Sequence, residues 1–379
     1  MKFFKIAVVV TFLVLNLSCK DDAATSTSKS ETSANSIVHA KGLAIYKYAG
    51  YSVVEVSTPW PDAKQSYSYV LKQRNATVPD SLKSHPTIEV PIRKIIVTAT
   101  THIPSLEMLG VENSLIGFPH CDYISSERVR ARIDAGHVKE VGNTLNLNTE
   151  IILDLNPDLI VAHGIDGNNP ALDNLQKSGL NVMLNGDWNE QTALGKAEWI
   201  KFFGALYGLE NKADSIFSDI EREYNNTLAL AKKVERRPTV LSGAIYENNW
   251  YLPQGDSWGA LLIAQAGGDY LWSDSVGTGS LSLAFETVLE KAQNAAVWIG
   301  PGQYTSLAEM TTANPHYSQF DAFKNKKVYS YSSKKGKTGG IIYFELAPNR
   351  PDLVIKDLVK ILHPELLPDH QLYFFEKVN

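Results

Sequence analysis

Hydrophobic and polar residues follow a helix–turn–strand pattern in the middle of the chain. Apolar residues recur at helical spacing over residues 151–155, after a capping residue, Asn148 or Thr149. Pro157 ends this helix because proline cannot continue the hydrogen-bond ladder. The run LIVA at residues 159–162 follows. A strand that is apolar on both faces is typical of a parallel sheet covered by helices.

The same pattern returns near the other end of the chain. Residues 282–292 predict a capped helix, and residues 296–300 (AVWIG) predict a buried strand. Two halves built in the same way indicate an α/β protein with two lobes. A cleft between two lobes is a common place for a ligand.

Further apolar runs complete this prediction. A long helical stretch over residues 189–233, broken near Gly208, separates the two halves. We therefore expect an N-terminal lobe at residues 39–188, an interdomain helix at 189–236 and a C-terminal lobe at 237–379. Strands are expected at residues 42–58 and 67–74 (an opening hairpin), 93–98, 115–117, 181–184, 239–245, 249–252 and 327–331. Helices are expected at residues 104–110, 123–135, 257–266 and 351–362.

The first nineteen residues read as a targeting segment. Lys2 and Lys5 precede the apolar run 6–15, which is too short to span a bilayer comfortably. The segment ends at Cys19 and resembles the cleavage box of bacterial lipoproteins, which implies acylation of Cys19. We expect a lipid anchor in the bacterial cell envelope, facing the periplasm or exposed at the outer membrane or cell surface.

A flexible tether is expected to follow at residues 20–38. Residues 23–36 contain no aromatic residue and no proline, so they have little apolar surface to offset the entropy of ordering. Such a segment is typical of a spacer between a membrane anchor and a folded domain.

Composition narrows the class of partner. The net charge is −5, and removal of Lys2 and Lys5 with the leader makes it more negative. This balance argues against nucleic acid as a partner. The two cysteines are Cys19 and Cys121, so acylation of the first excludes a disulfide within the chain.

The chain resembles the helical-backbone substrate-binding proteins of ABC importers for iron–siderophores, haem and cobalamin. The resemblance covers residues 90–363 and rests on five segments: RKIIVTATTHIPSLEMLG at 93–110, Val141-Gly142, residues 148–161, AQAGGD at 264–269, and residues 284–299. It implies two lobes joined by one long helix, with a small closing motion around the ligand. The β-rich opening at residues 42–85 and the extension at 367–379 depart from the family pattern.

The resemblance also implies a membrane permease as partner. Family members place a surface glutamate on each lobe to meet permease arginines, and Glu107 and Glu286 match those positions. Paired carboxylates on a rim steer a basic partner more than they add raw affinity. The opposing interpretation is that each is an ordinary glutamate near a helix start. We expect a monomer.

Aromatic side chains gather in the loops that follow the predicted strands. Large flat ligands need such walls. The alternative is that several of these residues pack the lobe interiors. The candidate ligand contacts in these loops are His102, Phe118, Tyr123, Trp188, Tyr246, Trp250, Tyr304 and Tyr343.

A glycine-rich basic loop, SSKKGKTGG at residues 332–340, adds three further candidates. Lys334, Lys335 and Lys337 would attract an anionic ferric chelate if this loop overhangs the cleft. A solvated surface loop is the equal alternative. A ferric siderophore is the expected ligand, with haem or cobalamin as alternatives, and no cofactor is expected.

Two other functions stay open. His102, His120 and His163 follow predicted strands, which suggests a zinc- or manganese-binding protein, but a fourth ligand is not evident. A Walker motif, a G-x-S-x-G elbow and an H-E-x-x-H helix are all missing from the sequence, so we do not expect an enzyme. A surface lipoprotein that captures chelates without a permease is the second alternative.

Overall fold

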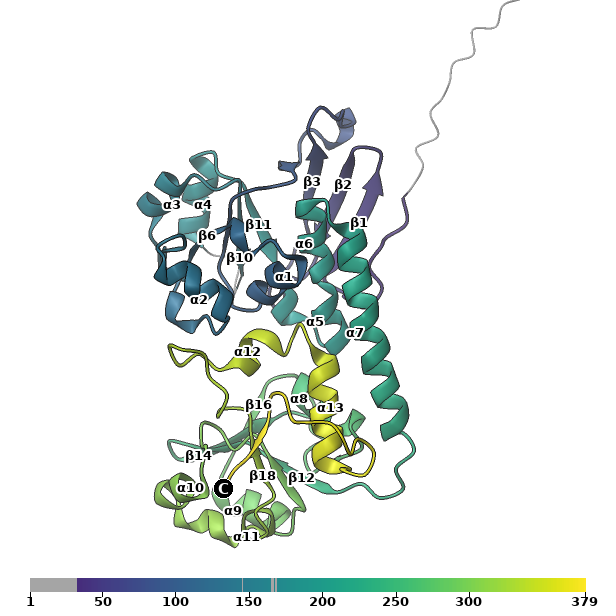
Figure 1. The fold of residues 1–379 in the computed structure, drawn as a ribbon, viewed down its shortest axis with the longest axis vertical. Coiled ribbons are helices and arrows are strands. Elements are labelled where there is room, and N and C mark those ends of the chain that lie inside the picture. Colours follow the sequence, from purple (N-terminus) through teal and green to yellow (C-terminus); the bar gives the residue numbers. More distant parts are fainter. Residues whose placement is uncertain (1–32, 145, 165–166, 168) are drawn as a thin grey trace, which may run out of the picture. The chain divides into compact units, whose positions relative to one another are not determined.

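The computed structural model describes residues 33–144, 146–164, 167 and 169–379. Ala34–Asn379 form one compact unit with two α/β lobes (Figure 1). We call residues 34–207 the N-terminal lobe and residues 232–379 the C-terminal lobe. The predicted leader, Cys19 and tether residues 20–32 lie outside the described residues. Among the described residues, no helix combines the length and apolarity needed to cross a membrane.

The N-terminal lobe is built on a parallel sheet of five strands in the order β11-β10-β5-β6-β7. Its strands are β5 (Ile95–Val97), β6 (Leu115–Phe118), β7 (Lys139–Glu140), β10 (Leu159–His163) and β11 (Val182–Asn185). Its helices are α1 (His102–Leu109), α2 (Glu127–Asp134), α3 (Thr149–Leu155) and α4 (Pro170–Lys177). The predicted run LIVA lies in β10 and is fully buried, as expected for a central parallel strand. A small hairpin contains β8 (Gly142–Asn143) and β9 (Asn146–Leu147).

The helix–turn–strand motif of the sequence folds as predicted. The Asn148 side chain caps α3 by accepting a hydrogen bond from the Ile151 amide, with Oδ1 and N 3.1 Å apart. Asn156 ends the helix in the left-handed conformation, with φ of 45°. Asparagine tolerates this conformation better than most residues, which explains a sharp stop immediately before Pro157.

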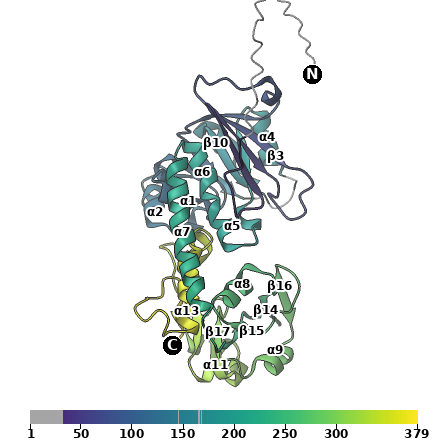
Figure 2. The ribbon, with the colours of Figure 1, turned by 90° about the vertical axis from the view of Figure 1, so that its right-hand side faces the viewer.

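The β-rich opening forms a separate sheet of four strands. The sheet contains β1 (Leu43–Tyr48), β2 (Tyr51–Val56), β3 (Tyr67–Gln73) and β4 (Thr87–Val90), in that order. The predicted strand at residues 42–58 is divided into β1 and β2, which pair with each other, and the predicted strand at residues 67–74 is β3, which pairs antiparallel with β2. The sheet lies beside α6 (Ile200–Tyr207), and both contribute to the same hydrophobic core (Figures 1 and 2).

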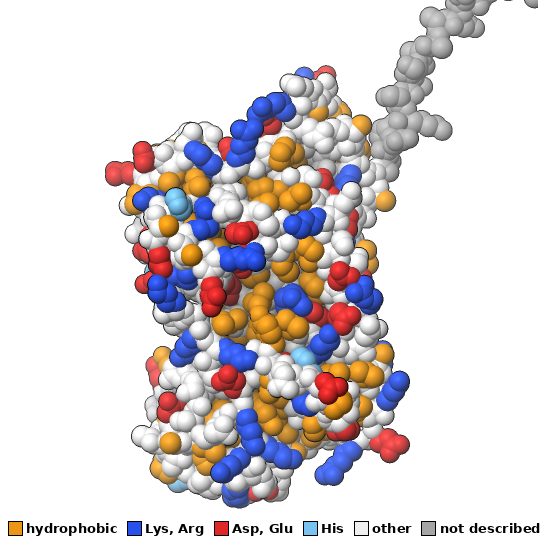
Figure 3. Space-filling model, in the orientation of Figure 1, with side chains coloured by type: hydrophobic (Ala, Val, Ile, Leu, Met, Phe, Trp, Pro, Cys, Tyr) orange, Lys and Arg blue, Asp and Glu red, His pale blue; other side chains and the backbone are white. Residues whose placement is uncertain are grey.

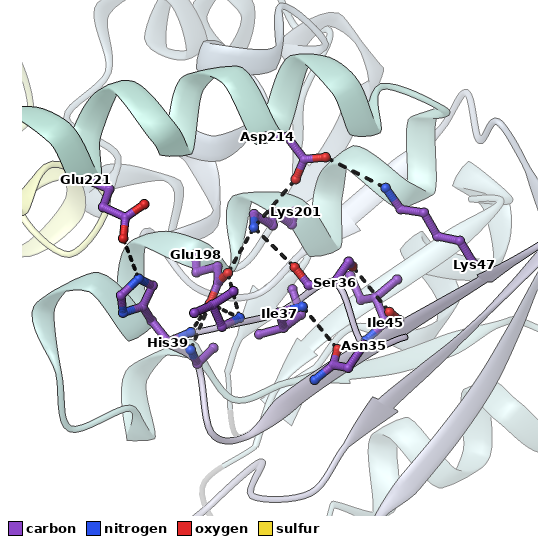
Figure 4. A network of polar contacts seen from close by, with 12 residues as sticks. Asn35, Ser36, Ile37, His39, Ile45, Lys47, Glu198, Lys201, Asp214 and Glu221 are labelled. Atoms are coloured by element: carbon purple, nitrogen blue, oxygen red, sulfur yellow. Dashed lines mark hydrogen bonds and ion pairs between the residues drawn. The ribbon is translucent and has the colours of Figure 1, made fainter. Parts of the chain in front are cut away.

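The segment before β1 is held by two buried carboxylates. Glu198 accepts hydrogen bonds from the amides of Val38, His39 and Ala40 at 3.0, 2.6 and 2.9 Å (Figure 4). Glu190 accepts from the next two amides along the chain. The predicted tether therefore extends too far, because its last residues, 34–38, belong to the folded unit.

The long helical stretch divides into three helices: α5 (Ala193–Glu198), α6 and α7 (Glu210–Ala231). Gly208 separates α6 from α7, and its φ of 65° suits glycine. The 22-residue α7 extends from one lobe to the other (Figure 2). Helix α13 (Pro351–Leu362) packs along it, and Lys356 of α13 pairs with Glu223 of α7 at 2.7 Å.

The C-terminal lobe repeats the α/β design. Its main sheet has the order β15-β12-β17-β18-β19 and contains β12 (Thr239–Ser242), β15 (Asp269–Tyr270), β17 (Val297–Ile299), β18 (Val328–Ser330) and β19 (Glu376–Lys377). A smaller sheet contains β13 (Ala244–Tyr246), β14 (Asn249–Pro253) and β16 (Ser280–Leu283). The remaining helices are α8 (Trp258–Gln265), α9 (Phe285–Ala292), α10 (Leu307–Ala313), α11 (Asp321–Lys324) and α12 (Ile342–Leu346).

Two boundaries in this lobe differ from the prediction. The expected helix at residues 282–292 begins only at Phe285, because Ser282 pairs with Tyr251 in the smaller sheet. The expected strand at residues 239–245 divides at Gly243, whose φ of 78° turns the chain from one sheet to the other. The C-terminal extension provides β19, which pairs antiparallel with β18 and covers that edge of the main sheet.

Candidate ligand-binding site

A cavity of about 460 Å³ lies at the carboxyl ends of β12 and β17. Ligands of open α/β sheets bind at such strand ends. Ser242 and Gly300 line the cavity at these strand ends, and the β13–β14 hairpin and the start of α8 form further parts of its wall. Its aromatic lining consists of Tyr246, Tyr251, Trp258, Tyr304 and Tyr331. We call this space the C-lobe cavity.

Trp258 connects the C-lobe cavity to the junction of the lobes. The same side chain lines a neighbouring cavity of about 370 Å³ between α5, α7 and α8. Its indole nitrogen is buried and has no hydrogen-bond partner among the described residues. A buried donor without a partner is rare in native proteins and points to a missing acceptor. The sequence analysis missed Trp258, although Ser257 correctly signalled the start of α8.

Buried polar side chains gather at the strand ends of the N-terminal lobe. His102 begins α1, the first helix after β5, and is 0% exposed, so its prediction as a direct ligand contact is wrong. Its Nε2 lies 3.9 Å from Oδ1 of Asp187, which follows β11. Burial lowers the pKa of His102 to about 4 and also lowers the pKa of His163. Both imidazoles are therefore neutral at pH 7. Among the described residues, the three histidine candidates are not part of a group of three side chains that could hold a metal ion.

The cleft is bridged on one side by residues 332–346, which we call the strap. The strap leaves the C-terminal lobe after β18 and ends with α12. Glu345 accepts hydrogen bonds from the amides of Ser125 and Ser126 at 2.7 and 3.0 Å. Thr338 donates to the carbonyl of Asp122 at 2.7 Å. The strap therefore joins the C-terminal lobe to the segment before α2 in the N-terminal lobe.

The α12 end of the strap lies in a hydrophobic part of the surface. Hydrophobic side chains gather at the middle of the face shown in Figure 3, around the junction where α12 lies. Tyr331 and Tyr343 stack with ring centroids 4.5 Å apart, and Phe344 packs edge-on against Tyr331. Tyr343 is thus one layer behind Tyr331, which itself lines the C-lobe cavity. The strap supports the cavity wall through this stack.

The lysines of the strap have partners other than a ligand. Lys334 donates to the backbone carbonyls of Leu372 and Tyr373, at 2.8 and 2.5 Å, which ties the strap to the C-terminal extension. Lys337 pairs with Asp134 of α2 at 2.8 Å and lowers the pKa of that carboxyl. The prediction of a loop that overhangs the cleft with free lysines is therefore wrong for these two residues. Hydrogen bonds from Thr305 lower the pKa of Glu309, and the charge of Lys335 adds to this shift.

Apart from Tyr343, which stacks on Tyr331, the six predicted aromatic contacts divide into three groups. Tyr246 and Tyr304 line the C-lobe cavity. Phe118 and Trp250 are wrong as direct contacts, because they are 2% and 0% exposed and pack the lobe interiors. Both side chains pack among apolar residues. The sequence pattern alone does not distinguish such an aromatic core residue from one that lines a cleft.

The remaining two predicted aromatics lie on the N-terminal lobe. Tyr123 is 62% exposed near the strap. Trp188 is half-buried, and its indole nitrogen donates to the carbonyls of Pro59 and Gly164 at 3.2 and 3.1 Å. Neither residue is assigned to the C-lobe cavity.

The two predicted docking glutamates have different environments. Glu286 is exposed in the first turn of α9. Glu107 of α1 is half-buried, accepts a hydrogen bond from the Ser126 hydroxyl at 2.5 Å, and has its pKa raised by burial. Glu107 therefore also belongs to the contact region between α1, α2 and the strap.

Comparisons with known proteins agree with this architecture. The model of the periplasmic binding protein family matches residues 95–334. An uncharacterised lipoprotein of Methanocaldococcus jannaschii is 29% identical over 328 residues, which cover 82% of this chain and 76% of the relative.

Solved structures give the same fold. Helicobacter pylori CeuE, solved with Ni(II) bound, aligns with a TM-score of 0.56 at 20% identity, covering 75% of this chain and 88% of that one. The periplasmic haem-binding protein HutB of Vibrio cholerae aligns with a TM-score of 0.55 at 18% identity, covering 69% and 99%. Since the family model spans more than half of the sequence, the chain belongs to the periplasmic binding protein family.

Proposed function

We propose that this protein captures a metal chelate, foremost a ferric siderophore, and delivers it to an ABC permease. The observation that carries the proposal is the C-lobe cavity of about 460 Å³ at the strand ends, with its five aromatic side chains. Cavities of this size and lining are typical of small-molecule sites. Family membership supports a binding role rather than catalysis.

The rigid connection between the lobes supports the same role. Helix α7 joins the lobes, α13 packs along it, and the strap bridges the cleft. A protein held in this way presents a preformed site, so little ordering entropy opposes binding. The lobes would then move only slightly when the ligand enters.

A chelate is favoured over a bare zinc or manganese ion. The described residues contain no group of three histidine, cysteine or acidic side chains arranged for a metal ion. Cys121 is buried, and burial raises the pKa of its thiol to about 11, so it remains protonated and unsuited to soft-metal binding. Haem and cobalamin are the alternative ligands, and their flat rings suit the same aromatic walls.

We further propose that the chain is anchored through an acylated Cys19 and meets the permease through Glu107 and Glu286. The lipoprotein relative from M. jannaschii supports the anchor. The exposure of Glu286 supports its docking role, whereas Glu107 has an additional structural contact. Capture without a permease is the alternative.

Titration of the purified protein tests the ligand class. Tryptophan fluorescence is a suitable signal because Trp258 lines the C-lobe cavity. We expect saturable quenching by at least one ferric siderophore, haem or cobalamin. Binding of zinc or manganese ions, without binding of any chelate below tens of micromolar, would replace the proposal with a metal-ion function.

A further inference from the structure

The C-lobe cavity has an uncharged wall. The described residues that line it include no lysine, arginine, histidine, aspartate or glutamate. Burial raises the pKa of the Tyr331 hydroxyl, so this wall residue adds no charge at pH 7. Besides the tyrosine hydroxyls and the indole of Trp258, the cavity is lined by hydroxyls, one carboxamide and backbone groups of Ser242, Ser257, Thr278, Gly279, Ser280 and Gln303.

Two strap lysines and the arginine of the adjoining turn are engaged elsewhere, and the third strap lysine, Lys335, is exposed to solvent. Lys334 donates to two carbonyls of the C-terminal extension, and Lys337 pairs with Asp134. Arg350 makes a two-point contact with Asp352, at 2.9 and 2.7 Å. In the neighbouring cavity, His39 pairs with Glu221 at 2.7 Å and Lys41 is exposed to solvent. Their positive charge is therefore compensated, tied to carbonyls or open to water.

A cavity without charged side chains binds a charged ligand poorly. A charged ligand that leaves water for a site without a counterion loses its hydration and gains no ion pair. An uncharged ligand keeps most of its binding energy, because aromatic rings cover its apolar faces and hydroxyls meet its polar edge. The buried indole N–H of Trp258, which has no partner among the described residues, offers a neutral hydrogen bond to a ligand acceptor.

We infer that the C-lobe cavity selects an uncharged chelate and discriminates against anionic ones. The inference rests on the proposed function and narrows its ligand class. Hydroxamate groups carry one negative charge each, so three of them balance a ferric ion. Catecholate groups carry two, so their ferric complex stays strongly anionic. The expected ligand is therefore a ferric hydroxamate or a similarly uncharged complex, with oxygen acceptors at its edge for Trp258.

The test compares uncharged and anionic ligands on the same protein. Ferrichrome and cyanocobalamin serve as uncharged probes, and ferric enterobactin and haem serve as anionic probes. We expect an uncharged probe to bind at least about tenfold more tightly than either anionic probe. Its affinity should stay constant as salt rises, since screening acts on charge. Tighter binding of an anionic probe overturns the inference and leaves the proposed function standing. Failure of all four probes defeats the proposed function itself, and the inference with it.

A pair of variants at one wall position separates charge from shape. Gln303 is an exposed wall residue, so Gln303→Arg introduces a cation without disturbing the core. We expect Gln303→Arg to strengthen ferric enterobactin binding by about tenfold, while Gln303→Glu does not. Lys335→Gln is the control and should change neither class of probe. An unchanged preference in Gln303→Arg would place charge selection elsewhere and contradict the inference.

Discussion

The carboxylate of Glu345 in the C-terminal lobe accepts a hydrogen bond from the backbone amide of Ser125 in the N-terminal lobe, with Oε2 and N 2.7 Å apart. The Glu345 side chain belongs to the strap and is 4% exposed as a residue. Burial raises its pKa to about 7, although two amides oppose the shift, and the nearby Glu107 adds to it. The contact between the lobes therefore contains a carboxyl group that gains a proton near neutral pH.

This relationship predicts a pH-dependent stability. A carboxyl whose pKa is higher in the folded state stabilises that state fully below its unfolded pKa and loses this contribution as pH rises through about 7. Wild type should therefore lose stability relative to Glu345→Gln between about pH 4.5 and 7, by on the order of 2 kcal/mol. Urea unfolding of both proteins across this range measures the difference. A constant difference would show that Glu345 does not titrate in this window.

His102 should produce the opposite trend. Burial lowers its pKa to about 4, so the folded state excludes the proton that the unfolded state accepts. Stability is present above the unfolded pKa near 6.5 and is lost as pH falls toward 4, by on the order of 2 kcal/mol. In urea unfolding, His102→Gln should therefore reduce the loss of unfolding free energy between about pH 6.5 and 4, whatever its effect on stability at pH 7. If the variant loses as much unfolding free energy over this pH range as wild type, other groups cause the loss.

The segment before β1 should depend on Glu198. Glu198→Ala removes the acceptor of three backbone amides and the partner of Lys201, which lies 2.9 Å away. We expect a loss of about 2–4 kcal/mol in unfolding free energy and faster proteolysis around residues 34–42. Glu221→Gln is the matched control, since its pair with His39 is partly exposed and should cost less than about 1 kcal/mol. Equal losses in both variants would contradict this assignment.

Trp258 should contribute a hydrogen bond and a wall to the ligand. Trp258→Phe keeps an aromatic ring but removes the unpaired donor, and we expect about tenfold weaker chelate binding. Trp258→Ala should weaken it further, toward about a hundredfold. Isothermal titration calorimetry with the tightest-binding chelate gives both values. Tyr373→Ala removes a partly exposed ring outside the two cavities and should leave affinity unchanged.

Alanine substitutions of the two docking glutamates should differ in their effect on protein stability. Glu286→Ala removes an exposed carboxylate, so ligand affinity and stability should stay constant while stimulation of the permease ATPase falls several-fold. Glu107→Ala also breaks the hydrogen bond to Ser126 and should lower stability as well. Reconstitution with the cognate permease provides the measurement. Loss of ligand binding in Glu286→Ala would refute a docking role.

The sequence by itself determined the two α/β lobes and most of their elements. Local signals were sufficient there: Asn148 caps α3, Asn156-Pro157 ends it, and the apolar run of β10 follows. Pro351 likewise marks the start of α13 at the predicted residue. Capping, proline stops and two-sided burial are decided by a few neighbouring residues, so they can be read from the chain.

The cleft was decided by tertiary structure. Trp250 and Trp258 are equally aromatic in the sequence, yet one fills the core and the other lines the cavity, because distant strands and helices determine which face is covered. Nor did the sequence show that Lys334 and Lys337 have partners 38 and 203 residues away along the chain. Packing between residues far apart in the chain determines which side chains remain available to a ligand. The local sequence pattern therefore does not predict them.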